Sequence, residues 1–282
     1  MEQERIRYPV SLMCRALDLS RSGFYAWRRR PESRRAVVNR RLMVEIKSIH
    51  QASLQTYGSP RMHFELRTKG IRCSLNRTAR LMQQAGVHAV IHRRFCLTTD
   101  SDHDYPVAAN ILNRQFAVSE PNRAWVVDIT YIATDEGWLY LAATMDLHSR
   151  RIVGWAFSNR IDRELTMSAL RMALGRRQPG PELLHHSDRG SQYACHDYQD
   201  LLSSRGVICS MSRRGNPYDN AVMESFFRTL KAEWVNRHHF DTREEGKSEL
   251  VKYIELFYNA RRRHSALGYL SPAEYERQSE PT

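Results

Sequence analysis

The sequence predicts two parts, a basic all-α region followed by an α/β domain built in layers. Three observations favour this fold class. Residues 1–99 hold 20 Lys and Arg against 6 Asp and Glu, whereas residues 100–282 hold 23 against 25. The first part has the apolar periodicity and the cap residues of short helices. From residue 125 onward, apolar β-branched runs alternate with helical stretches, which is typical of a sheet covered by helices.

Bulk properties exclude several classes of protein. The chain has 282 residues, of which 41% are hydrophobic, enough for a core. No apolar run approaches the roughly 18 to 20 residues that a membrane span needs, and "MEQERIRYPV" is not a secretory signal. The five cysteines are scattered without C-x-x-C spacing, as in proteins with reduced thiols. We therefore expect a soluble cytoplasmic protein.

His88, His92 and Cys96 are four residues apart, a spacing that can indicate a zinc site. A structural zinc ion needs a fourth ligand, which is usually supplied by a closely paired Cys or His. None follows, so we attribute this spacing to chance.

The first 58 residues predict three helices. The first spans 10–17, and the second runs through 24–30 and stops at Pro31. "AVVNRRLMVEIKSIHQ" follows with apolar residues at helical spacing, which predicts the third.

The stretch "YGSPRMHFELRTKGIRCSLNRTARLMQQAGV" predicts a helix-turn-helix. Ser59 is expected to cap a helix whose first residue is Pro60, and Gly70 to end it. Ser74 is expected to cap a second helix that ends at Gly86. Two short capped helices joined by a tight turn form this motif, although a plain helical hairpin has the same pattern.

The second of these helices is the predicted recognition helix. Asn76, Arg77 and Arg80 lie near its start, where such helices meet bases and phosphates. The positive charge of this part of the chain favours DNA as the ligand over a solvated basic surface.

Three regions are predicted. Residues 1–96 form a basic helical region that binds DNA. Residues 97–124 are polar, include Pro106, and are expected to be a partly extended linker. Residues 125–282 form the α/β domain with a basic helical segment at its end.

The α/β domain is expected to begin with an antiparallel meander. "WVVDITYIA", "WLYLAATMDL" and "RIVGWAFS" are β-rich and joined by short connections. The rest predicts the order α-β-α-β-α: a helix at 162–175, a strand at 182–187, a helix at 196–205, the strand "GVICS", and a helix within 216–234.

Three carboxylates of this domain are candidates for a functional site. Asp128 lies in mid-strand, where a carboxylate needs a cation or a salt bridge. Asp188 follows a short strand, where ligand sites gather, although an Asx-turn or helix-cap role explains it equally. Glu224 lies beside the apolar stripe of the last helix, with Lys231 two turns later on the same face.

Together these carboxylates predict a site for divalent cations. Oxygen ligands suit Mg²⁺ or Mn²⁺, and two such ions support phosphoryl transfer. Asp146 and Asp219 are rival carboxylates. A structural role is sufficient for both, because Asp146 can cap or pair with Arg150 or Arg151, and Asp219 starts a helix.

The end of the chain holds "YNARRRHSALG". Arg261, Arg262 and Arg263 are expected to contact DNA, and a solvated basic helix is the alternative. His185 and His186 in "HHSD" are interpreted as packed residues without a catalytic role.

The blocks "WVVDITYI", "HHSDRGSQY" and "NPYDNAVMESFFRTLK" closely resemble the signature blocks of insertion-sequence transposases with a retroviral-integrase-like core. More narrowly, the chain resembles the OrfB-type subunit of the IS-three family. The 59 residues between Asp128 and Asp188 and the 35 between Asp188 and Glu224 match its pattern. "PNRAW", "YNARRRHSALGYLSPAEY" and the helix-turn-helix segment extend the resemblance over nearly the whole chain.

The resemblance implies an RNase H-like, integrase-type catalytic core over residues 125–282. It implies that Asp128, Asp188 and Glu224 are catalytic and ligate Mg²⁺ or Mn²⁺, with two ions per site, and that Lys231 contacts DNA ends. The implied partners are double-stranded DNA, as terminal inverted repeats and target, and an OrfA-type protein or frameshift fusion. A homo-oligomer on DNA in the bacterial cytoplasm is also implied.

The implied activity is a DNA transposase that cleaves strands at element ends and transfers them. Two alternatives stay open at this point. An RNase H-like nuclease would use the same three carboxylates, and a non-catalytic DNA-binding regulator of transposition would not need them.

Overall fold

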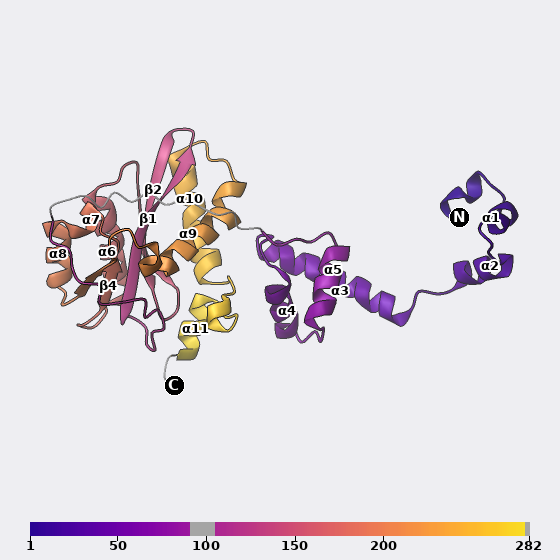
Figure 1. Ribbon diagram of the computed structural model, residues 1–282, viewed down its shortest axis with the longest axis horizontal. Coiled ribbons are helices and arrows are strands. Elements are labelled where there is room, and N and C mark those ends of the chain that lie inside the picture. Colours follow the sequence, from indigo (N-terminus) through magenta and orange to yellow (C-terminus); the bar gives the residue numbers. More distant parts are fainter. Residues whose placement is uncertain (91–104, 280–282) are drawn as a thin grey trace.

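The computed structural model describes residues 1–90 and 105–279, shown in Figure 1. Residues 97–104 of the predicted linker, together with His92 and Cys96, lie outside the described residues. The described residues of the first part of the chain form a short 3-10 helix, η1 (Gln3–Ile6), and the α-helices α1 (Val10–Ala16), α2 (Arg21–Arg29), α3 (Arg34–Ala52), α4 (Ser59–Thr68) and α5 (Leu75–Gln84). Nowhere in the two described ranges is a helix long and apolar enough to cross a membrane.

Helices α3, α4 and α5 share a small apolar core. Ile46, Met62, Leu66 and Leu81 are fully buried in it. Each comes from a helix whose other face is polar, so the three helices must pack together to cover their apolar stripes. In Figure 1 these helices lie between the pair α1 and α2 and the rest of the molecule.

The cap residues of the helix-turn-helix are those predicted from the sequence, except at the start of α4. Ser74 Oγ accepts a hydrogen bond from Arg77 N and caps α5 as predicted. Gly70 follows α4 with φ +74°, a left-handed conformation that glycine adopts without strain. The prediction that Ser59 caps α4 is wrong, because Gly58 holds that position and Ser59 is already helical.

The α/β domain is built on a five-stranded mixed sheet with the order β3-β2-β1-β4-β5. β1, β2 and β3 pair antiparallel, which confirms the predicted meander, and β4 and β5 run parallel to β1. The strands are β1 (Ala124–Thr134), β2 (Gly137–Asp146), β3 (Ile152–Ser158), β4 (Leu184–Ser187) and β5 (Ile208–Met211).

Helices cover both faces of this sheet. One face carries Trp125 and Val127 against α6 (Arg163–Arg177), α7 (Ser191–Ala194) and α8 (His196–Ser203). The opposite face carries Val126 and Ile132 against α9 (Ala221–Glu233), α10 (Arg243–Lys252) and the π-helix η4 (Tyr253–Asn259). Alternate residues of β1 thus enter two separate cores, which is why apolar residues occur at consecutive positions from Ala124 to Val127.

The described part of the predicted linker packs on this domain. Leu112 is buried in the core beneath α9. Ser210 Oγ on β5 accepts hydrogen bonds from Ile111 N at 2.9 Å and Leu112 N at 3.2 Å. Residues 105–123 are therefore held against the sheet, while the domain limits drawn from the sequence stay a prediction.

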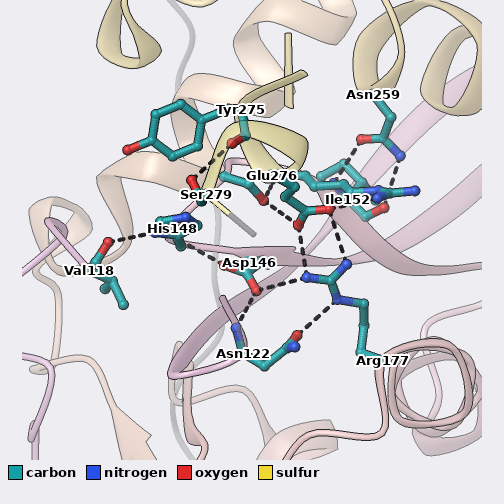
Figure 2. Close-up of polar contacts among 12 residues, drawn as sticks. Val118, Asn122, Asp146, His148, Ile152, Arg177, Asn259, Tyr275, Glu276 and Ser279 are labelled. Carbon is teal, nitrogen blue, oxygen red and sulfur yellow. Dashed lines mark hydrogen bonds and ion pairs between the residues drawn. The ribbon is translucent and has the colours of Figure 1, made fainter. Parts of the chain in front are cut away.

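Asp146 ends β2 and is fully enclosed by donors, as Figure 2 shows. Its Oδ2 accepts a hydrogen bond from Asn122 N at 2.7 Å, and its Oδ1 accepts one from His148 N at 2.8 Å. The capping role that the sequence offered is confirmed by the bond from His148 N, whereas the ion-pair partner of Asp146 is Arg177 of α6, at 3.7 Å, and not Arg150 or Arg151. Arg177 also binds Glu276, which anchors helix α11 (Pro272–Ser279).

Asp219 lies in the short 3-10 helix η2 (Pro217–Asn220) before α9 and is fully buried. It accepts hydrogen bonds from Arg114 at 2.8 Å, Arg213 at 2.9 Å and Asn110 at 2.9 Å. Burial alone would raise its pKa, but the bonds from the two arginines hold that pKa well below its usual range. Its role is structural, as the sequence indicated, although its partners are arginines and not a helix dipole.

We expect Asp219→Asn to lower the free energy of unfolding by about 2 kcal/mol at pH 7, because two arginines lose their anion. The difference from wild type should narrow as pH falls below about 4, since a carboxyl with a depressed pKa loses its contribution in acid. Urea unfolding measures both effects. Asp200→Asn, at an exposed position of α8, is the control, and an equal response of the two variants would contradict the assignment.

Candidate active site

Asp128 lies in the middle of β1, on the face covered by α9. It follows the buried Val126 by two residues, so the alternation of the strand places both side chains on that face. The side chain is half-buried, and its Oδ1 accepts a hydrogen bond from Ile129 N at 2.8 Å. A strand fixed on both edges therefore presents one carboxylate towards α9.

Asp188 stands one residue beyond the end of β4. Val126 of β1 pairs with His186 of β4 in parallel register, and continuing this register by two residues brings Asp188 level with Asp128. Asp188 Oδ1 accepts a hydrogen bond from Gly190 N at 2.9 Å, which closes an Asx-turn. The predicted Asx-turn is therefore present, and it is compatible with a ligand-binding role because it fixes the carboxylate level with Asp128.

Glu224 comes from the first turn of α9. The helix is held against the sheet by its apolar stripe, which includes Met223, Phe227 and Leu230. Asn220 adds a polar contact, since its Nδ2 donates to the carbonyl oxygen of Val127 at 3.0 Å. This bond joins the start of α9 to the residue before Asp128, and sequence reasoning did not identify it.

The charges of Asp188 and Glu224 both act on Asp128. Burial raises the pKa of Asp128 well above its usual value, and the negative charges of Asp188 and Glu224 raise it further. Lys231 acts in the opposite direction. Burial also raises the pKa of Glu224. The ligand atoms of Asp128, Asp188 and Glu224 do not all lie within 4.8 Å of one another in the described structure, but carboxylate oxygens are the ligands that divalent cations prefer.

Lys231 lies on α9 two turns after Glu224. Burial lowers its pKa to about 8, and the charge of Asp128 acts against that shift. Its Nζ lies 4.2 Å from the centroid of the Tyr131 ring, which is within cation–π range. Tyr131 is exposed on β1 and was not predicted as part of the site.

The two histidines of β4 are packed residues, as the sequence indicated. His185 bonds to the hydroxyl of Tyr198 at 3.0 Å, and His186 bonds to Ser210 at 2.9 Å and Ser212 at 3.1 Å. Burial lowers the pKa of His185 to about 3 and that of His186 to about 4, so both are neutral at pH 7.

The structure separates the three C-terminal arginines. Arg262 and Arg263 are buried, and Arg262 pairs with Glu233 at 2.7 Å while Arg263 pairs with Glu65 at 2.7 Å. Their guanidinium groups are engaged in ion pairs within the chain, and the contact of these two residues with DNA stays a prediction. Arg261 is exposed, and its contact with DNA stays a prediction.

The three residues predicted to bind DNA from α5 differ in exposure. Asn76 and Arg80 are exposed. Arg77 is half-buried and donates two hydrogen bonds to Asn39 Oδ1 of α3, at 3.1 and 2.7 Å. Arg77 thus also ties the two helices together.

We expect Asp188→Asn to lower the pKa of Asp128 more than Glu224→Gln does, because the negative charge of Asp188 is the larger of the two neighbouring causes. Carbon-13 NMR titration of the carboxyl groups in metal-free protein measures this pKa. Asp200→Asn, at an exposed position, should leave the pKa unchanged. An unaltered Asp128 in the Asp188 variant would show that the two groups do not share a site.

Comparison with known proteins agrees with this architecture. An integrase core domain model matches residues 118–217, a second integrase core domain model matches 205–272, and an HTH-like domain model matches 38–95. The HTLV-2 integrase catalytic core domain, solved in complex with magnesium, superposes with a TM-score of 0.45 at 15% identity. That match covers 55% of this chain and 97% of the other.

Two relatives cover nearly the whole chain. The chain is 46% identical over 263 residues to the insertion element IS600 uncharacterized 31 kDa protein of Shigella sonnei, which covers 93% of this chain and 97% of that protein. It is 40% identical over 278 residues to the transposase InsF for insertion sequence IS3A of Escherichia coli strain K12, with 98% and 96% covered. The chain therefore belongs to the IS3 family of InsF-like transposases, with an integrase core domain and an HTH-like region.

Proposed function

We propose that this transposase cleaves one DNA strand at the ends of its element and joins the freed 3′-hydroxyl to target DNA. Asp128, Asp188 and Glu224 are the proposed catalytic residues. The observation that supports the proposal is the parallel register of β1 and β4, which brings Asp188 level with Asp128, together with the bond from Asn220 to Val127 that fixes the start of the helix carrying Glu224.

The proposed cofactor is Mg²⁺ or Mn²⁺, with two ions per site. The donor set supports it, because carboxylate oxygens are the ligands that these hard cations prefer. When bound, the ions supply Lewis-acid stabilisation of the attacking and leaving oxygens of a phosphodiester. Asp128 on β1 and Asp188, just past the end of the adjacent β4, would hold the ions from the sheet, and Glu224 would hold them from α9.

The chain's own residues then have to position DNA. In strand transfer the 3′-oxygen forms a new bond to the target phosphorus while the target's own P–O3′ bond breaks. The number of phosphodiester bonds stays the same, so neither a nucleotide cofactor nor a covalent enzyme intermediate is needed. Such chemistry depends on placement and charge neutralisation. Lys231 would contribute a positive charge to the DNA end beside the carboxylates.

The proposed DNA ligands are the terminal inverted repeats of the element and its target. The basic first part of the chain supports this proposal, with Asn76, Arg77 and Arg80 of α5 at the bases and phosphates and Arg261 as a further contact. We propose that the protein works in the bacterial cytoplasm as a homo-oligomer that holds two ends together. An OrfA-type partner or frameshift fusion would complete the complex.

We expect Glu224→Gln to abolish Mg²⁺-dependent cleavage and strand transfer while DNA affinity stays within about threefold of wild type, because one ligand charge is lost but the fold is kept. Labelled duplexes that carry the element's end, taken from DNA flanking the gene, provide the assay. Glu249→Gln on α10 is the matched control.

Full activity of the Glu224→Gln variant would refute the catalytic assignment. The products decide between the proposal and its rivals. Nicked DNA without joined DNA in wild-type reactions indicates an RNase H-like nuclease. Binding that persists in EDTA without any cleavage in Mg²⁺ indicates a regulator.

Lys231→Gln should weaken binding of end DNA and reduce the slope of log affinity against log salt by about one, the amount expected for one lost phosphate contact. Lys231→Arg should preserve the slope, since it keeps the charge. Fluorescence anisotropy over a salt series measures both. A slope that is the same in all three proteins would mean that Lys231 contacts no phosphate.

A further inference from the structure

The helix-turn-helix region touches the catalytic domain through a defined contact that we call the latch. It comprises Tyr57, Phe64 and Glu65 on one side and Arg263 and Tyr269 on the other. The hydroxyl of Tyr57 accepts a hydrogen bond from Arg263 N at 2.9 Å and lies 3.2 Å from the carbonyl oxygen of Arg261, to which it donates. Tyr57 is 2% exposed and packs in the apolar core beneath α9.

The rest of the latch is charged and aromatic. Arg263 Nε lies 2.7 Å from Glu65 Oε1 of α4, and the same guanidinium binds Glu274 of α11. The rings of Phe64 and Tyr269 stack with centroids 5.7 Å apart. The side chains of Arg263 and Glu65 are only 10% and 20% exposed, so this pair is shielded from water, unlike an ordinary surface salt bridge.

The latch continues directly into α9. Arg262, the residue before Arg263, donates two hydrogen bonds of 2.7 Å to Glu233, the last residue of α9. Arg61 of α4 faces the same carboxylate at 3.9 Å. One buried glutamate therefore joins a helix of the DNA-binding region to the helix that carries Glu224.

Both ends of this connection are stiff. Glu233 and Glu224 share one uninterrupted α-helix, and α4 packs with α5 in a common apolar core. A protein that held DNA through α5 would thus hold that DNA at a fixed position relative to Glu224. Short DNA is itself stiff, so the position passes along the duplex.

We propose that the latch sets the distance along the DNA between the sequence that α5 reads and the phosphodiester that is cut. The latch residues are positioning residues for cleavage, and they neither bind bases nor hold the ions. This inference rests on the proposed function. In this proposal, Arg262 and Arg263 connect the two parts of the chain through their pairs with Glu233 and Glu65.

The test compares Glu65→Gln combined with Tyr57→Phe against wild type on end-labelled duplexes from the DNA flanking the gene. We expect DNA affinity within threefold of wild type. Cleavage at the normal position should fall about ten- to hundredfold, because ångström-scale misplacement has costs of this size. Part of the product should appear at neighbouring phosphodiesters. Glu45→Gln is the control, since Glu45 pairs with Lys69 at 3.1 Å inside the DNA-binding region.

Cleavage by the double variant at the wild-type position and rate would overturn the proposed role of the latch. A loss of DNA affinity as large as the loss of cleavage would overturn it too. If the double variant fails to fold by circular dichroism, Glu65→Gln alone carries the same expectation with a smaller effect. Absence of cleavage in wild type itself would instead refute the proposed function, so the two failures are distinguishable.

Discussion

The chemistry proposed for this protein depends on the negative charge around Asp128. Burial raises the pKa of this carboxyl, and the charges of Asp188 and Glu224 raise it further. Such a group gains from a bound cation. We propose that β1, the turn after β4 and helix α9 hold the three carboxylates for that cation.

The contrast with the other buried carboxylates is informative. Asp146 and Asp219 are also enclosed, but each is surrounded by main-chain donors and arginines. Their charges are satisfied within the protein, so they stabilise the fold. Among the described residues, Asp128 accepts a hydrogen bond from Ile129 N, and the charges that act on it are those of Asp188, Glu224 and Lys231. Asp128 therefore differs from Asp146 and Asp219 in its partners, because no arginine pairs with it in the described structure.

Helix α9 links the site to the rest of the chain. Its apolar stripe fixes it to the sheet, Asn220 fixes its start to β1, and Glu233 fixes its end to Arg262. The helix thus carries Glu224 between two anchors. Because the second anchor also reaches α4, the same helix connects the chemistry to the part of the chain that recognises DNA.

Local patterns were sufficient to predict most of the fold. The three-stranded meander, the cap at Ser74 and the face of Asp128 follow from residue types within a few positions, and the spacing of the acidic residues matches a known family. Long-range pairing was not predictable. Arg263 pairs with Glu65, which lies 198 residues earlier in the chain. Nothing in "ARRRH" distinguishes a buried arginine from an exposed one. Arg177 as the partner of Asp146 and Asn220 as the partner of β1 escaped prediction for the same reason.

The most direct test of this account is a crystal soaked in Mn²⁺ and measured for anomalous scattering. The account predicts anomalous peaks bounded by oxygens of Asp128, Asp188 and Glu224, and a loss of those peaks in Glu224→Gln crystals. It would be contradicted if the wild-type site held no peak at millimolar Mn²⁺ while Lys231 Nζ occupied the space between the carboxylates.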